Sequence, residues 1–166
     1  MYRVSGAYLQ SGALPYRVGK HGRPEVLVVL SDSKRWTIPK GRTEPHLSLA
    51  DNAAKEAFEE AGVIGEIALR PSGTYRATKR CDSGRMTIEV WVYLLRVTEA
   101  MKRWPEKQRR QARWVSCPEA ARLLGEPLLQ RLCRQLEDAA KTTARRDDRP
   151  LVAAAVRRVR RASRRI

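Results

Sequence analysis

Three glutamates, Glu56, Glu59 and Glu60, stand at positions i, i+3 and i+4 and carry the clearest chemical signal in this sequence. On a helix this spacing brings the three side chains onto one face, where their like charges repel. Divalent cations that prefer oxygen ligands relieve such repulsion, and Mg²⁺ is usually held by a few carboxylates together with substrate phosphates. An isolated E-x-x-E-E pattern is also typical of a solvated acidic face, so the surrounding residues decide between the two interpretations.

Residues 41–63 read GRTEPHLSLADNAAKEAFEEAGV. This segment resembles the signature box of the Nudix hydrolase family: Gly, five residues, Glu, seven residues, Arg-Glu, a hydrophobic residue, any residue, Glu-Glu, any residue, Gly and a hydrophobic residue. The matching positions are Gly41, Glu56, Ala57, Glu59, Glu60, Gly62 and Val63. Leu47 replaces the first Glu of the box and Lys55 replaces its Arg, and neither position is a direct ligand of the family's main metal site. The resemblance extends over roughly residues 5–138.

The resemblance implies hydrolysis of a diphosphate linkage with Mg²⁺ as the cofactor and Mn²⁺ as an alternative. A bound cation polarises phosphoryl oxygens and makes coordinated water more acidic. The resemblance also implies that Glu56, Glu60 and the backbone carbonyl of Gly41 are metal ligands. Glu59 is then either a further ligand or the general base, and both roles stay open.

Cationic side chains beside the box are predicted to hold the phosphates of the substrate. Lys40 and Arg42 flank Gly41 and are the first candidates, and Arg17 is the next; ordinary surface charge is the competing interpretation. The remaining candidates have weaker signals. They comprise one possible loop base, two possible metal-ligand histidines, two tryptophans that could stack on a base and one possible substitute for the first Glu of the box. A surface, packing or turn role is favoured for each of them. These are Glu106, His21, His46, Trp36, Trp104 and Glu44.

The predicted elements position the glutamates on a helix over residues 48–61, with Gly62 at its left-handed cap. Small apolar residues fall on the side of this helix opposite the carboxylates, which predicts packing on a sheet with all three carboxylates outward. β-branched and aromatic residues predict strands over 6–18, 25–31, 35–40, 86–97 and 112–116, and helical periodicity predicts helices over 117–124 and 127–141. This order indicates an α/β (α+β) sandwich, which the resemblance specifies as a Nudix-type α/β/α sandwich with a mixed central sheet.

The net charge of +16 is divided equally between a predicted domain, residues 1–140, and a basic tail, residues 141–166. The tail combines a linker with LVAAAVRRVRRASRRI, which is compatible with a basic amphipathic helix or a disordered segment. Both parts favour polyanions, so the tail is a candidate for binding nucleic acid or an acidic surface. No apolar run approaches a membrane span, and the odd cysteine count favours reduced thiols in the cytoplasm. The sequence does not indicate an oligomeric state.

Segments such as PKG, PYR and RWV resemble the diphosphoinositol polyphosphate phosphohydrolase branch most closely. That resemblance implies densely charged substrates, namely diphosphoinositol polyphosphates and dinucleoside polyphosphates. A second enzymatic hypothesis is an RNA 5′-pyrophosphohydrolase whose tail holds the RNA backbone. A hypothesis of another class is a non-catalytic module that senses a ligand or binds polyanions, and retention of all three glutamates favours an enzyme over it.

Overall fold

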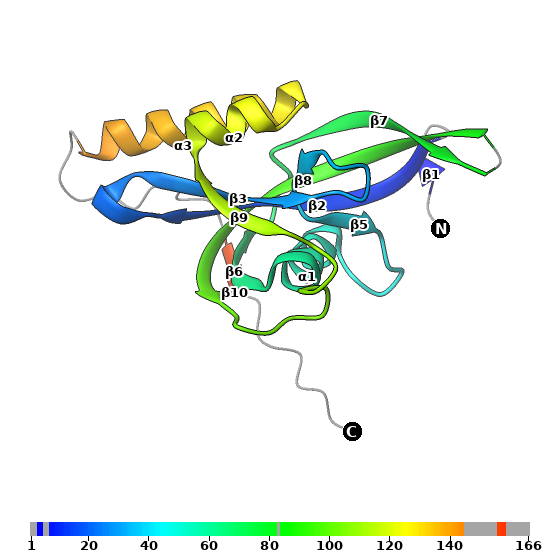
Figure 1. The fold of residues 1–166 in the computed structure, drawn as a ribbon, viewed down its shortest axis with the longest axis horizontal. Coiled ribbons are helices and arrows are strands. Elements are labelled where there is room, and N and C mark those ends of the chain that lie inside the picture. The colour runs from blue at the N-terminus through cyan, green and yellow to red at the C-terminus, as the bar shows by residue number, and fades with distance from the viewer. Residues whose placement is uncertain (1–2, 5–6, 83, 145–155, 159–166) are drawn as a thin grey trace.

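The computed structural model describes residues 3–4, 7–82, 84–144 and 156–158 of the chain (Figure 1). Its centre is a mixed sheet in which β2 and β8 run parallel and the other pairs run antiparallel. The strands are β1 (Arg3–Val4), β2 (Ala7–Val18), β3 (Pro24–Leu30), β4 (Trp36–Thr37), β5 (Lys40–Arg42), β6 (Val63–Ala68), β7 (Gly73–Cys81), β8 (Gly84–Ala100), β9 (Ala112–Ser116) and β10 (Val156–Arg158). The helices are α1 (Leu49–Ala61), α2 (Cys117–Leu123), α3 (Pro127–Ala144) and the 3-10 turn η1 (Lys20–Gly22).

Helices cover both faces of this sheet, α1 on one side and α2 with α3 on the other (Figure 1). Successive side chains of a strand point to opposite faces, so each central strand supplies both cores. On β3, for example, Val26 and Val28 pack under α2 and α3, whereas Leu27 and Val29 pack under α1. The predicted α/β/α sandwich with a mixed sheet is therefore confirmed.

The helix predicted over 48–61 is α1, and both of its ends have the expected caps. Ser48 accepts a hydrogen bond from the backbone N–H of Asp51 at 3.0 Å and so satisfies one of the free donors of the first turn. Gly62 adopts φ 67° and donates its N–H to the carbonyls of Ala57 and Phe58. A residue with a side chain is strained at this φ, which explains the glycine.

The strand predicted over 35–40 is instead divided into β4 and β5 by Ile38 and Pro39. Proline lacks the N–H that a strand interior needs, but its carbonyl accepts a hydrogen bond from the N–H of Ala13 at 3.0 Å. The chain then pairs Lys40–Arg42 with β2, where Gly41 lies opposite Ser11. This break places Gly41 beside α1.

The predicted strand over 86–97 is longer in the structure, because β7 and β8 form an extended hairpin that the sequence did not indicate. β6 was also missing from the prediction; it follows the cap at Gly62 and pairs with β8. The strand over 112–116 and the helices over 117–124 and 127–141 are confirmed as β9, α2 and α3, and α3 continues to Ala144.

The first four residues of the predicted basic tail belong to the end of α3, and Val156–Arg158 form β10 against β6. A helix over these three residues is therefore wrong, because the edge of β6 offers backbone groups that an added strand can satisfy. The rest of the predicted tail beyond Ala144 lies outside the described residues. Within the described part of the chain, no helix is long and apolar enough to cross a membrane.

Candidate active site

The structure brings Glu56, Glu60 and Gly41 together where α1 faces β5. The carboxylate of Glu56 lies directly against Gly41, so that a Cβ atom at position 41 would overlap it. The backbone N–H of Lys40 donates to Oε2 of Glu60 at 3.3 Å. The three groups that the sequence predicts as metal ligands therefore occupy one small region.

Glu60 is only 6% exposed, so the expectation that all three carboxylates point outward is wrong for this residue. It is covered by β5 and by Arg110, whose Nη2 lies 2.9 Å from Oε1 of Glu60. Burial raises the pKa of Glu60, while the positive charges of Arg110 and Lys40 oppose the increase. A buried carboxylate with charged partners is typical of a functional site.

Glu56 is also partly buried beside β5, and none of the described lysines or arginines forms an ion pair with it. Burial raises the pKa of Glu56 from 4.5 to about 7, and the nearby charge of Glu60 adds to the increase, which Lys55 partly offsets. At neutral pH this pair of carboxylates thus favours any added cation, either a proton or a metal ion.

This pKa shift predicts how the metal-free protein responds to pH. Between pH 4.5 and about 7 the unfolded chain releases the Glu56 proton while the folded protein retains it. The contribution of Glu56 to stability is therefore complete below pH 4.5 and is lost as the pH rises through about 7. At pH 8 with EDTA, we expect Glu56→Gln to raise the free energy of unfolding by about 1 kcal/mol, after allowance for solvent screening. Urea unfolding at pH 5 and pH 8 measures this, and a gain of equal size at both pH values would contradict it.

Lys55, which stands at the arginine position of the box, binds two carboxylates. Its Nζ lies 2.6 Å from Oε2 of Glu59 and 3.0 Å from Oε1 of Glu44. Glu44 is fixed in turn because its N–H donates to Asn52, a buried side chain that donates to Ser11 at 2.9 Å. The lysine therefore retains an orienting contact to Glu59, and the turn residue Glu44 acts as its second partner.

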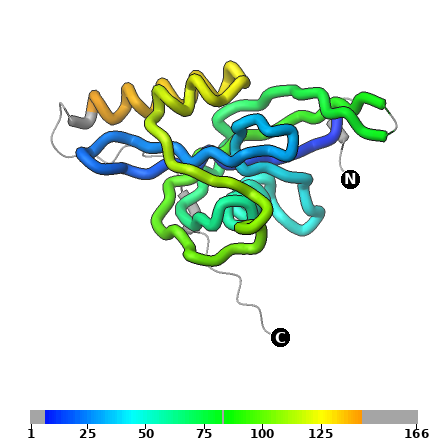
Figure 2. Tube along the Cα trace, viewed as in Figure 1, coloured from blue at the N-terminus to red at the C-terminus, as the bar shows by residue number. Residues whose placement is uncertain are grey.

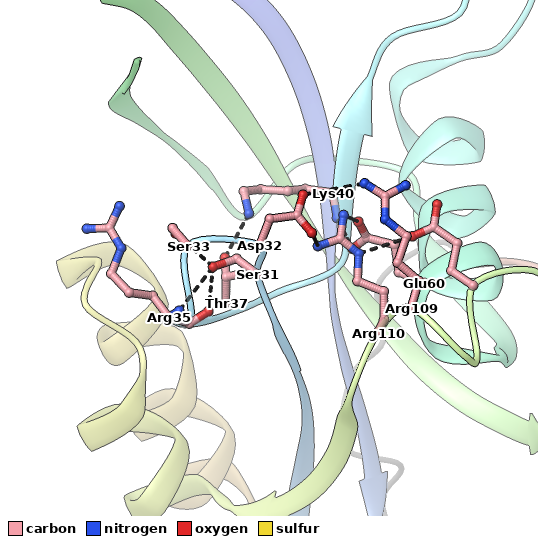
Figure 3. A network of polar contacts seen from close by, with 10 residues as sticks. Ser31, Asp32, Ser33, Arg35, Thr37, Lys40, Glu60, Arg109 and Arg110 are labelled. Atoms are coloured by element: carbon pink, nitrogen blue, oxygen red, sulfur yellow. Dashed lines mark hydrogen bonds and ion pairs between the residues drawn. The ribbon is translucent and has the colours of Figure 1, made fainter. Parts of the chain in front are cut away.

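The loop between β8 and β9 contributes Glu106 and also Arg109 and Arg110, which the sequence did not single out. This loop passes around α1 (Figure 2), and the N–H of Glu106 donates to the carbonyl of Glu59 at 3.0 Å. Figure 3 shows Arg109 and Arg110 extending toward Asp32 and Glu60. Glu106, for which a loop surface role was favoured, is thus close to the glutamate helix. In the sequence, the i, i+4 spacing of Glu106 and Arg110 was the pattern that could have indicated this ion pair.

Two of the three predicted phosphate-binding residues, Lys40 and Arg42, flank Gly41 on β5. Lys40 donates through Nζ to Thr37 at 2.8 Å, and burial lowers its pKa. Arg42 is exposed on β5. Arg17 instead binds Glu25 at 2.7 Å and stacks on Trp114 at 4.0 Å. It lies five residues along β2 from the Lys40 pairing position, or about 17 Å.

Three of the four remaining side chains that the sequence left open contact other residues in the structure. His46 lies 3.2 Å from Glu44, and His21 is exposed in η1. Trp36 packs against the core under α2 and α3, with Arg113 over its ring. Trp104 lies against Gly62, where it covers the end of α1.

Comparison with known families gives a match to the NUDIX domain over residues 12–136. This chain belongs to the Nudix hydrolase family. It is 32% identical over 126 residues to Nudix hydrolase 21, chloroplastic, of Arabidopsis thaliana, with 74% of this chain and 62% of the relative covered. It is 34% identical over 104 residues to diphosphoinositol polyphosphate phosphohydrolase 3-beta of Bos taurus, with 60% of each covered. The chain thus spans a little over 60% of the length of such relatives.

Solved structures share the Nudix fold at lower sequence identity. A C. elegans Ap4A hydrolase complex has a TM-score of 0.56 at 18% identity, with 83% of this chain and 99% of that chain covered. The NUDIX domain of Shewanella oneidensis NrtR complexed with ADP ribose has a TM-score of 0.60 at 16% identity, with 81% and 89% covered. These similarities support the fold described above.

The Nudix helix fits a divalent cation through its donor set. Among the described residues, no three His, Cys, Asp or Glu side chains converge into a ready-made metal cage. Mg²⁺ does not require one, because it is usually held by one or two carboxylates and retains several waters. Glu56 and Glu60 provide two such carboxylates beside Gly41, and burial raises the pKa of each.

Proposed function

We propose that this Nudix hydrolase is Mg²⁺-dependent, with Mn²⁺ as an alternative, and cleaves a diphosphate linkage in a highly charged substrate. Diphosphoinositol polyphosphates and dinucleoside polyphosphates are the substrate classes. The observation that carries this proposal is a cavity of about 180 Å³ between the 31–34 turn and the β8–β9 loop. Among the described residues that line it, Asp32 is the only acidic one, and four are cationic: Lys34, Lys107, Arg109 and Arg110.

The position of this cavity connects it to the glutamates. Arg110 lines the cavity and also contacts Glu60, so the cationic lining of the cavity is adjacent to the proposed metal ligands. A substrate whose diphosphate lies at Glu56 and Glu60 can therefore place further phosphates among the cations. Such a site favours substrates with many phosphates over those with one short diphosphate.

The residues have distinct proposed roles. Glu56, Glu60 and the carbonyl of Gly41 would hold the metal ion, which when bound polarises phosphoryl oxygens and acidifies coordinated water. Lys55 orients Glu59, whose carboxylate is a further ligand or the general base. Lys40 and Arg42 provide positive charge at β5 for the reacting phosphates, while a role for Arg17 requires a substrate that extends along β2.

The name of the Bos taurus relative supports diphosphoinositol polyphosphates as the first class to test. The test is release of phosphate or nucleotide from four groups of compounds with Mg²⁺: diphosphoinositol polyphosphates, dinucleoside polyphosphates, nucleoside triphosphates and triphosphate-capped RNA. We expect turnover of the first two groups, and its loss in Glu60→Gln. Preference for capped RNA would favour the RNA 5′-pyrophosphohydrolase hypothesis. Absence of turnover with every compound would favour a non-catalytic binding module.

A further inference from the structure

Arg110 binds three carboxylates that come from three parts of the chain. Its Nη2 lies 2.9 Å from Glu60, its Nε lies 3.0 Å from Glu106, and its Nη1 lies 3.4 Å from Asp32. Although Arg110 belongs to a loop, its side chain is only 14% exposed. The neighbouring Arg109, by contrast, is 63% exposed, and within the described part of the chain its side chain has one ion pair, with Asp32 at 3.5 Å.

We propose that Arg110 is an internal counterion for Glu60 and that a divalent cation binds this site by displacing it. The inference rests on the proposed metal site. In the metal-free protein, both oxygens of Glu60 already have donors: Arg110 at Oε1 and the N–H of Lys40 at Oε2. A cation that takes Glu60 as a ligand must compete for these oxygens and also meets the positive charge of the guanidinium a few ångströms away.

The surroundings of Arg110 allow this exchange without rearrangement of the fold. When its contact to Glu60 is lost, the guanidinium retains Glu106 and Asp32 as acceptors. The loop itself stays attached, because the N–H of Glu106 donates to Glu59 and the N–H of Met101 donates to Gly62. Rotation of one side chain is therefore sufficient. Arg110 sets the affinity for the metal ion and maintains the charge balance of the empty site.

The first test measures Mn²⁺ affinity at pH 8 from the electron paramagnetic resonance signal of free Mn²⁺. We expect Arg110→Gln to bind Mn²⁺ about tenfold more tightly than wild type, since one charge-assisted hydrogen bond no longer has to be broken. Arg109→Gln removes the same charge one residue away and should stay within about twofold, as expected for an exposed group. Glu56→Gln marks the site, because it should weaken binding.

A second measurement follows the exchange in the unmodified protein. Nuclear magnetic resonance of arginine Nε–H groups, with Arg110 assigned from Arg110→Lys, should show a large shift on addition of Mg²⁺, while Arg109 stays unchanged. Mn²⁺ affinity in Arg110→Gln that equals or falls below that of wild type, or an Arg110 signal indifferent to Mg²⁺, overturns the counterion role. Failure of every protein to bind Mn²⁺ overturns the proposed metal site itself, and the inference with it.

Discussion

Replacing Glu56 by glutamine should lower kcat with Mg²⁺ by about a hundredfold to a thousandfold, the range seen when a group that stabilises transition-state charge is removed. The substitution retains the shape of the side chain but removes the charge that lies against Gly41. Because Glu56 and Glu60 are the two side-chain carboxylates of the proposed metal site, the loss of one of these charges weakens the site for a dication directly. Initial rates with the best substrate of the panel, at saturating Mg²⁺, measure the effect.

Glu66→Gln is a matched control, because Glu66 belongs to β6 and binds Arg96 at the surface. It should change kcat by less than about twofold, as expected of an exposed ion pair. Two measurements on Glu56→Gln, kcat with Mg²⁺ and the free energy of unfolding without metal, test the same role. The variant is expected to lose activity but to gain stability at pH 8 when metal-free. A variant that loses both activity and stability would show that Glu56 supports the fold, and a kcat within tenfold of wild type would contradict its role as a metal ligand.

Local sequence patterns predicted the part of the site that belongs to one helix. Ser48 and Gly62 mark the ends of α1, and the spacing of Glu56 and Glu60 fixes their common face, because caps and helical period depend on neighbours within a few residues. The central strands were predicted for a similar reason, since each of them is an apolar segment longer than a turn. The short strand β6 follows the helix cap without a clear alternation and was missed.

Contacts between distant segments could not be predicted in this way. Asp32 and Arg110 are 78 residues apart and meet only because β3 and β9 pair next to each other in the sheet. The burial of Glu60 has the same origin, since a helical projection shows which side of α1 is polar but not that β5 and a loop cover part of that side. The break in the strand at Ile38 and Pro39 likewise depends on a distant segment, because β5 pairs with β2.

Gly41→Ala should lower kcat by about a hundredfold with little change in stability. The added methyl group would overlap the carboxylate of Glu56, and this carboxylate is the end of a flexible side chain. The protein can therefore accommodate the methyl group by rotating Glu56 away from β5. Rotation of one partly exposed side chain changes the free energy of unfolding by about 1 kcal/mol or less, whereas a misplacement of about 1 Å in a catalytic group costs about a hundredfold in rate.

Gly125→Ala is the control for this substitution, because, apart from its two chain neighbours, none of the described residues has an atom within 4 Å of the position that its methyl group would take. Rates and urea unfolding of both variants separate the two explanations for the glycine. A Gly41→Ala protein that is active but unstable would mean that Gly41 serves the pairing of β5 with β2. An inactive protein of normal stability, with Mn²⁺ affinity reduced as in Glu56→Gln, would mean that Gly41 is a glycine because the carboxylate of Glu56 must lie against it.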